Sequence, residues 1–231
     1  MNYKKRIVDG MEVCFSADWI TTLEKEIHFN WYWNQANLVY THCSKDQKIL
    51  EIGVGTSLLS DLLKRRGWHL HTLDIDEKKK PDFCASAADF DYSAQSIDVI
   101  LAFEVFEHIP FSTFEKVIAK LSVSNVRFVY FSLPWCERQI VNLCFKLPKL
   151  QKVSLSYTRP RGNITTQAHF WELSRKGKSL DGKQLVTIEK LQNLFTDNGY
   201  SFDALNKIGY IQYFRATKLG RQRHFRSESS R

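Results

Sequence analysis

The sequence predicts an α/β fold with a doubly wound sheet of seven strands, mostly parallel and with an antiparallel edge strand. Three observations support this prediction. Short apolar runs alternate with helix-like stretches between residues 48 and 134. One of these runs, IDVILAF, is continuously apolar, as is typical of a central parallel strand with both faces buried. Near the C-terminal end, SFDALNKI and YIQYFRAT follow one another as two strands that close the sheet.

The predicted elements follow in chain order. Residues 17–41 carry apolar and aromatic side chains at mixed three- and four-residue spacings, which predicts a helix that caps the ligand site. KILEIGVGTS is a strand that ends in glycines and passes into the helix LLSDLLKRRG, closed by Gly67. The remaining elements up to Pro134 are strands in WHLHTLDID, DFCAS, IDVILAF and NVRFVYFSLP and a helix in FSTFEKVIAKLS.

Residues 135–186 interrupt this alternation and are long for a connection in a compact domain. They begin with WCERQIVNLCFKLPKLQ, continue as a loop that bears Lys and Arg, and end in AHFWELSRKGKSLDG. We interpret the segment as a lid or insertion on the substrate side. The helix TIEKLQNLFTDNGY then resumes the fold, with Thr187 as its N-cap.

The chain length of 231 residues suits one domain, which we place at residues 1–218. No apolar run reaches the ~20 residues that cross a bilayer and no secretory signal is present, so we expect a cytoplasmic protein. The five cysteines are scattered, and we expect reduced, mostly buried thiols. The net charge is +8, and residues 219–231 form a basic tail that we expect to be flexible. This charge keeps RNA and an acidic membrane surface open as alternative partners.

Two glycines and an acid mark a ligand site at the strand ends. Gly53 and Gly55 follow the first main strand, where missing β-carbons let the backbone turn sharply and approach a ligand. Asp74 ends the next strand, where an acid in dinucleotide-binding folds accepts hydrogen bonds from ribose hydroxyls, and Asp76 is the alternative. Leu58 occupies the third glycine position of GxGxxG, which weighs against NAD.

The stretch from Ile49 to Pro134 resembles the class I S-adenosylmethionine-dependent methyltransferases, through ILEIGVGTSLLSDLLKRRG, LDID and SIDVILAFEVFEHIP taken together. The resemblance implies a Rossmann-like sheet and S-adenosylmethionine as the cofactor. The family often carries an acid after the third strand, where this chain has Ser86, with Asp89 as its substitute. The cofactor site implied in this way consists of Glu51, Gly53 and Gly55 at the methionine end, Asp74 at the ribose, Ile75 beside the adenine, and Ser86, Asp89 and Phe103.

The motif EVFEH follows the fourth strand, where the acceptor and the sulfonium meet in this family. On a helical turn, Glu104, Glu107 and His108 project from one side, and carboxylates with an imidazole suit Mg²⁺, Mn²⁺ or Zn²⁺. With His169 from the insertion, the pattern resembles the small-RNA 2′-O-methyltransferases, and a similar ExxEH occurs in ubiquinone-pathway O-methyltransferases. That resemblance implies a metal site formed by Glu104, Glu107, His108 and His169. The alternative is an EH pair that caps a helix and braces a loop without metal.

Taken whole, the chain is similar to bacterial methyltransferases with EVFEHIP and HFWEL motifs, which we associate with sugar modification in surface polysaccharide pathways. We therefore expect O-methylation of a sugar-like, glycan or other small acceptor, lipid-linked acceptors included, with His108, His169 and Glu104 as catalytic residues and His169 as a candidate base. The alternatives are a metal-assisted RNA 2′-O-methyltransferase and a non-catalytic module that binds S-adenosylmethionine. Six aromatic residues are candidates for the wall of the acceptor pocket, with ordinary core packing as the alternative for each: Trp31, Tyr32, Trp33, Trp135, Phe170 and Trp171.

Overall fold

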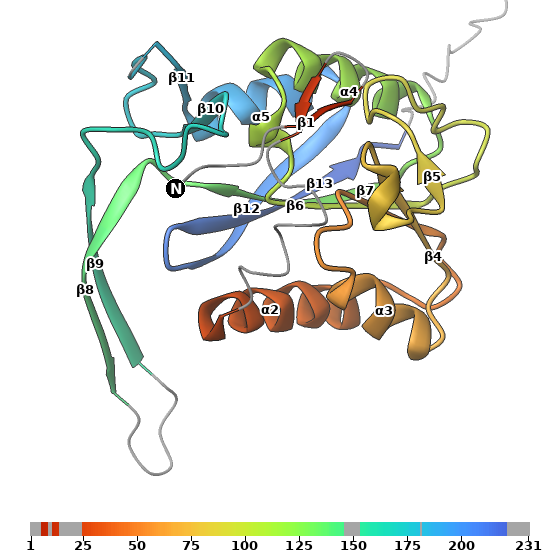
Figure 1. The fold of residues 1–231 in the computed structure, drawn as a ribbon, viewed down its shortest axis with the longest axis horizontal. Coiled ribbons are helices and arrows are strands. Elements are labelled where there is room, and N and C mark those ends of the chain that lie inside the picture. The colour runs from red at the N-terminus through yellow and green to blue at the C-terminus, as the bar shows by residue number, and fades with distance from the viewer. Residues whose placement is uncertain (1–5, 9–10, 14–24, 146–152, 181, 221–231) are drawn as a thin grey trace, which may run out of the picture.

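The computed structural model describes residues 6–8, 11–13, 25–145, 153–180 and 182–220. A seven-stranded sheet forms its centre, in the order β12-β13-β7-β6-β3-β4-β5 (Figure 1). The parallel strands are β3 (Ile49–Ile52), β4 (Leu70–Asp74), β5 (Phe83–Cys84), β6 (Val99–Phe103) and β7 (Phe128–Pro134). The antiparallel hairpin at one edge consists of β12 (Tyr200–Ile208) and β13 (Ile211–Lys218). The predicted fold class is confirmed, and the reversed strand is β13, which lies between β7 and β12.

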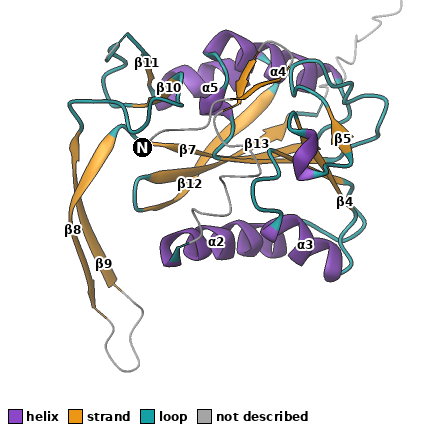
Figure 2. Ribbon diagram, in the orientation of Figure 1, coloured by secondary structure: helices purple, strands orange, loops and turns teal. Residues whose placement is uncertain are grey.

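Helices cover both faces of the sheet (Figure 2). One face carries α2 (Glu26–His42) and α3 (Leu58–Arg65), and the other carries α4 (Phe111–Val123) and α5 (Ile188–Asp197). Successive residues of β6 alternate between two apolar cores, since Val99 packs with the α2 and α3 residues and Ile100 with those of α4 and α5. This double burial explains why the strand is apolar at every position. Thr187 is confirmed as the N-cap of α5, because its hydroxyl accepts a hydrogen bond from the Lys190 amide.

The strand order reverses between β3 and β6. From β3 the chain moves outward through β4 to β5 and then returns to β6 on the other side of β3. The connections that leave the carboxyl ends of β3 and β6 therefore diverge to opposite faces, which opens a crevice between them. Gly53 follows β3 and Glu104 follows β6, so both predicted motifs lie at this crevice.

The insertion contains more strand than we predicted. β8 (Glu137–Phe145) and β9 (Val153–Pro160) form a two-stranded antiparallel ribbon that extends away from the domain (Figure 1). The loop expected after Lys152 is therefore wrong over the length of β9, and the alternation in VSLSYTR was the strand signal. Two further pairs of strands are β10 (Trp171–Leu173) with β11 (Gln184–Val186), parallel, and β1 (Arg6–Val8) with β2 (Met11–Val13), antiparallel.

Two short 3-10 turns complete the elements, η2 (Glu77–Lys79) and η3 (Phe106–His108). Of the helix predicted over 17–41, the structure shows α2, and residues 14–24 lie outside the described residues, as do 221–231 of the predicted tail. The domain limits stay predictions. None of the helices in the described ranges is long and apolar enough to span a membrane. Cys43, Cys84 and Cys136 are free, and of these three only Cys136 shows the expected burial, because Cys43 is half-buried and Cys84 exposed.

Candidate active site at the carboxyl ends of the strands

A cavity of about 430 Å³ opens where β3 and β6 diverge. Its wall combines α2, the turn after β3, the end of β4, the segment after β6, residues 165–169 of the insertion and Tyr210 from the turn between β12 and β13. The predicted site residues that line it are Glu51, Gly53, Gly55, Asp74, Ile75, Ser86, Phe103, Glu104, Glu107, His108 and His169. The predicted residue outside the lining is Asp89, which is exposed on the turn that follows the buried Ser86.

The glycine turn after β3 fits closely against the segment after β6. Gly53 has φ +79° and Gly55 has φ +57°, in the left-handed region that favours glycine. A β-carbon on Gly53 would lie 2.4 Å from Cγ2 of Val105, closer than two carbons can approach. Gly53 therefore meets both a conformational and a steric demand, because Val105 fills the space that a side chain would need.

Asp74 connects this turn to the end of β4. Its carboxylate accepts hydrogen bonds from the amides of Val54, at 2.9 Å, and Asp76, at 2.8 Å. The ammonium group of Lys79 makes a buried ion pair with the same carboxylate at 2.9 Å. A carboxylate has roughly four acceptor positions, so these three donors leave about one for a ribose hydroxyl. The sequence analysis missed Lys79, because a lysine in the run DEKKK reads as a solvated charge.

Several buried polar atoms around the cavity have no partner among the described residues. They are Nε1 of Trp31, Oε2 of Glu51 and both carboxyl oxygens of Glu107. Burial raises the pKa of Glu51 to about 8, although a hydrogen bond with Ser60 opposes the shift. Buried polar groups are nearly always paired in native proteins, so this set indicates a ligand that supplies the missing partners.

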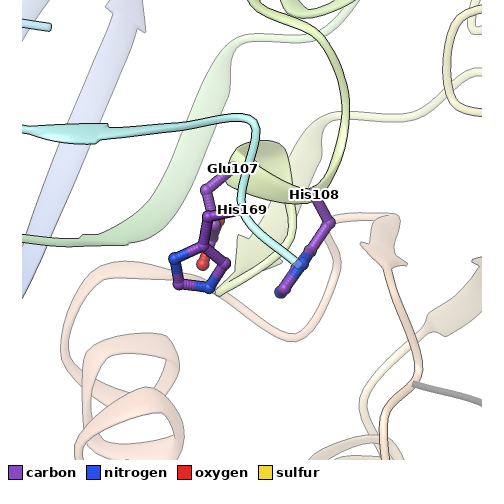
Figure 3. Close-up of side chains that lie close together, drawn as sticks. All are labelled: Glu107, His108 and His169. Atoms are coloured by element: carbon purple, nitrogen blue, oxygen red, sulfur yellow. The ribbon is translucent and has the colours of Figure 1, made fainter. Parts of the chain in front are cut away.

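Glu107, His108 and His169 converge at one side of the cavity. Each offers a ligand atom, and these atoms all lie within 4.8 Å of one another (Figure 3). The two imidazole rings meet edge to face, with centroids 4.8 Å apart. Glu107 is fully buried and His169 is 6% exposed. The structure thus brings together three of the four predicted metal ligands from two distant parts of the chain.

The outer contacts of the two histidines fix which ring nitrogen carries the proton. Nδ1 of His108 lies 3.2 Å from the carbonyl oxygen of Ala168, and Nδ1 of His169 lies 2.6 Å from the Glu172 carboxylate. Because these oxygens only accept hydrogen bonds, we assign the proton of each neutral ring to Nδ1. Nε2 of each ring is then unprotonated. This is the arrangement by which proteins orient metal-binding or proton-accepting imidazoles.

Burial governs the charges of this cluster. It raises the pKa of Glu107 well above its ordinary value, and the nearby Glu104 raises it further. Burial also raises the pKa of Glu104 to about 8, opposed by a hydrogen bond from Ser132. The pKa of His108 is lowered well below its ordinary value by burial and by the neighbouring His169. Crowded carboxyl groups of this kind would be stabilised as anions by an added cation.

Glu104 differs from the prediction. The helical turn expected over residues 104–108 is wrong, because Glu104 has φ +55° and η3 begins only at Phe106. The Glu104 amide donates to the Ser132 hydroxyl at 3.1 Å, and that hydroxyl donates to the Glu104 carboxyl at 2.9 Å. These bonds hold the carboxyl on β7, at the cavity wall but outside the cluster of three. A non-glycine residue in this strained conformation is a common feature of functional sites.

The segment that carries His169 is fixed to the main domain. The Phe170 amide donates to the Glu107 carbonyl at 2.8 Å. The indole of Trp171 is fully buried against Phe111 and donates to the Ile109 carbonyl at 3.1 Å. His169 is therefore held in place by the two residues that follow it, although it belongs to the insertion.

The six aromatic candidates divide between cavity, core and surface. Trp31 and Tyr32 line the cavity, whereas Trp33 is 64% exposed. Trp171 and Trp135 pack in the core beside α4 and α5, and Phe170 lines a separate surface groove of about 830 Å³. The analysis missed Tyr210, whose position in a hairpin turn carries no sequence signal of a ligand site.

Replacing Glu51 by glutamine is expected to flatten the pH dependence of stability. Folded Glu51 keeps its proton up to about pH 8, whereas the unfolded chain loses it near the ordinary pKa of 4.5. The stability that this group adds is complete below that value, and it falls by roughly 1.4 kcal/mol per pH unit as the pH rises through the window. Urea unfolding between about pH 5 and about pH 9 measures the slope. Glu189→Gln, at an exposed position, is the control, and equal slopes for wild type and Glu51→Gln would contradict the assignment.

Comparisons with known proteins agree with this geometry. A family model described as a methyltransferase domain matches residues 23–222. No curated protein matches the chain in sequence. Among solved structures, the fold is similar to the magnesium protoporphyrin IX methyltransferase from Synechocystis PCC 6803 with bound S-adenosylmethionine, at 16% identity and a TM-score of 0.51, over 83% of this chain and 80% of that one.

Two further structures show the same likeness. The 1,6-didemethyltoxoflavin-N1-methyltransferase from Burkholderia thailandensis is 11% identical, with a TM-score of 0.52 over 82% of this chain and 78% of that one. An S-adenosylmethionine-dependent methyltransferase from Clostridium acetobutylicum ATCC 824 is 8% identical, with a TM-score of 0.53 over 87% and 95%. At these identities the likeness concerns the fold.

Proposed function

The chain belongs to the methyltransferase domain family, and on that premise we propose that it methylates a hydroxyl oxygen of a sugar-like or other small acceptor. The methyl donor is S-adenosylmethionine, as in the structures that share the fold. The observation that carries the proposal is the convergence of Glu107, His108 and His169 in the same cavity as the glycine turn. That arrangement places groups able to activate a hydroxyl beside the groups suited to hold the methyl donor.

The cofactor half of the cavity fits S-adenosylmethionine. The turn at Gly53 has no side chain to block a ligand, and Asp74 keeps about one acceptor position for a ribose hydroxyl. Oε2 of Glu51 is buried without a partner among the described residues, which supports a hydrogen bond from the ammonium of the methionine end. The cavity side of Ile75 gives an apolar surface for the adenine.

The acceptor half supplies a proton acceptor. Methyl transfer needs the acceptor oxygen, the methyl carbon and the sulfur in line, so most of the catalysis is positioning. The oxygen forms a bond to the methyl carbon while the carbon–sulfur bond breaks, and its electron pair stays on the sulfur. His169 takes the hydroxyl proton on Nε2, and Glu172 stabilises the resulting imidazolium through Nδ1. His108 is the second candidate base on the same wall.

The same three side chains fit a divalent cation such as Mg²⁺ or Mn²⁺. Both oxygens of Glu107 lack a partner among the described residues, and Nδ1 of each histidine faces an oxygen that orients the ring. Glu107, His108 and His169 would hold the ion, with positions left for acceptor oxygens. A bound divalent cation supplies Lewis acidity that makes a hydroxyl more nucleophilic. Glu104 would contribute negative charge from the cavity wall, because Ser132 holds its carboxyl apart from the cluster.

A small acceptor suits the dimensions of the site. The volume of about 430 Å³ is typical of small-molecule pockets, and it must hold both the cofactor and the reacting part of the acceptor. Two of the structures with the same fold are named for small acceptors, magnesium protoporphyrin IX and 1,6-didemethyltoxoflavin. An RNA would need a basic track that leads to the cavity.

The test is transfer of label from methyl-labelled S-adenosylmethionine. The protein is incubated with monosaccharides, nucleotide sugars and bacterial glycans, and in parallel with total RNA. We expect the label in a sugar fraction and stable to mild alkali, because an O-methyl ether resists alkali and a methyl ester does not. Label in RNA that is lost when residues 219–231 are deleted would support the RNA alternative. Binding of S-adenosylhomocysteine without transfer to any acceptor would support the non-catalytic module.

A further inference from the structure

The ribbon of β8 and β9 has one apolar face. Its register pairs Val141 with Tyr157 and Leu143 with Leu155 across the two strands. Side chains alternate along a strand, so these residues and Phe145 fall on one face. The residues at the intervening register position, Asn142 and Ser156, are polar in the sequence. The ribbon is therefore amphipathic by its register.

This apolar face is open to solvent. Leu143 is 46% exposed, Phe145 55%, Leu155 61% and Tyr157 60%. The ribbon extends away from the sheet and its helices in Figure 1, and among the described strands its two strands pair only with each other. An isolated two-stranded ribbon is marginally stable in water, and a contiguous exposed apolar patch marks an interaction site. The ribbon is expected to gain stability from the partner that covers this face.

The charge of the ribbon indicates the kind of partner. Arg138 and Arg159, both exposed, are directly opposite one another in the register, and like charges in such a pair repel. In the sequence, residues 137–160 contain five Lys or Arg and one acid, Glu137, whose carboxylate binds Lys207 and Arg175 of the domain. A partner that combines negative charge with an apolar layer would match both the basic residues and the exposed apolar side chains of the ribbon. We propose that the β8–β9 ribbon docks on a lipid bilayer that contains anionic lipids.

Two other partners fit less well. A second copy of the chain would bring two basic ribbons together, and the charges would oppose that contact. A nucleic acid would satisfy the arginines, but it offers no apolar layer for Leu143, Leu155 and Phe145. An anionic bilayer takes both, since its headgroups attract Arg and its acyl boundary accepts apolar side chains.

Helix α2 adds a second apolar surface on the same side of the sheet. Phe29 is 53% exposed and Trp33 is 64% exposed, and at i and i+4 they share one side of the helix. Both α2 and the outer part of the ribbon lie below the sheet in Figure 1. Exposed Trp and other aromatic rings are typical of the interface between headgroups and hydrocarbon.

The root of the ribbon lies beside the active-site cavity. The Trp135 amide, two residues before β8, donates to the carbonyl of Tyr210 at 2.8 Å, and Tyr210 lines the cavity. At the first residue of β8, the Glu137 carboxylate binds Lys207 at 2.9 Å and Arg175 at 3.0 Å. The ribbon is thus anchored in the domain, and docking would hold the cavity at a bilayer surface, where a lipid-linked acceptor is presented.

Vesicle co-sedimentation of the full chain tests this proposal, and it needs neither cofactor nor acceptor. We expect binding to vesicles of phosphatidylcholine and phosphatidylglycerol in equal parts, weakening with added salt, and about tenfold less binding to phosphatidylcholine alone. The double variant Leu143→Ser/Phe145→Ser is expected to bind the anionic vesicles about tenfold more weakly. Arg138→Gln/Arg159→Gln should show a loss of about the same size and a smaller salt dependence than the wild type, since the other basic residues remain.

The matched control is Val123→Ser, which removes an 82% exposed apolar side chain at the end of α4. It should bind as the wild type does, and thermal unfolding shows that every variant is folded. The proposal is overturned if the wild type binds neither kind of vesicle, or if Val123→Ser loses as much binding as the ribbon variants. It is also overturned if sedimentation velocity without lipid shows a dimer that Leu143→Ser/Phe145→Ser dissociates, or if these variants lose RNA binding and keep vesicle binding.

Discussion

Gly53→Ala is expected to lower the affinity for S-adenosylhomocysteine by about 100-fold or more, as measured by calorimetry. The added methyl group would lie 2.4 Å from Val105, so Val105 must move, and the cavity is the open space beside it. The backbone at φ +79° also becomes strained, which is expected to lower the free energy of unfolding by about 1–3 kcal/mol. To assign the glycine turn to the cofactor site, the loss of affinity must be larger than the loss of stability alone can explain.

Gly199→Ala separates the two effects. Gly199 has nearly the same backbone, φ +78°, but a β-carbon there meets nothing within 4 Å. This variant should therefore lose stability through strain and keep its affinity for the cofactor product. Adding Val105→Ala to Gly53→Ala removes the steric clash, and we expect part of the stability to return without full recovery of binding. If Gly53→Ala bound S-adenosylhomocysteine as tightly as Gly199→Ala does, the glycine turn would not be the cofactor site.

Glu107→Gln is expected to lower methyl transfer by about 100-fold or more, because it removes a carboxylate from the group that activates the acceptor. The affinity for S-adenosylhomocysteine should stay within about threefold of wild type, since the glycine turn and Asp74 are unchanged. Stability should change little, because glutamine has nearly the size of glutamate and burial, which raises the pKa of Glu107, already favours an uncharged side chain at this position. Single-turnover rates and equilibrium binding separate these effects.

The metal is tested on the same variant. Calorimetric titration with Mn²⁺ is expected to show one site in the wild type and none in Glu107→Gln or His169→Ala. Glu189→Gln and His69→Ala, at exposed positions, are the matched controls and should behave as the wild type does. Transfer that survives a chelator but not Glu107→Gln would assign the cluster to proton transfer without metal. Wild-type transfer by Glu107→Gln would remove the cluster from the mechanism.

The cofactor half of the site could be predicted from the sequence because its signals are local. Gly53 and Asp74 end neighbouring strands of one strand–helix–strand unit, and parallel strands place their carboxyl ends at one edge of the sheet. The continuous apolar run of β6 reports burial on both faces in the same way. Chain-local patterns of this kind need no knowledge of tertiary contacts.

The acceptor half depends on contacts that no local pattern records. The pairing of β7 with β13 brings the hairpin turn, and with it Tyr210, to the cavity. Lys79 reads as a solvated charge until its buried contact with Asp74 is seen. The helical spacing of Glu104, Glu107 and His108 was misleading, because the bonds to Ser132 favour a left-handed residue at Glu104. The strand β9 was detectable from its alternation and was missed.

The burial of Trp171 limits how the insertion of this protein can be exchanged for that of a related enzyme. An insertion that carried only surface residues could be swapped between related enzymes to change the acceptor. Here Trp171 lies two residues after His169. Its indole packs on Phe111 and Phe114 of α4 and donates a hydrogen bond to the Ile109 carbonyl. A chimera that imported a foreign segment without these α4 positions would leave a void in the core and misplace the imidazole. A change of acceptor by exchange of this segment is therefore expected to need matching substitutions in α4.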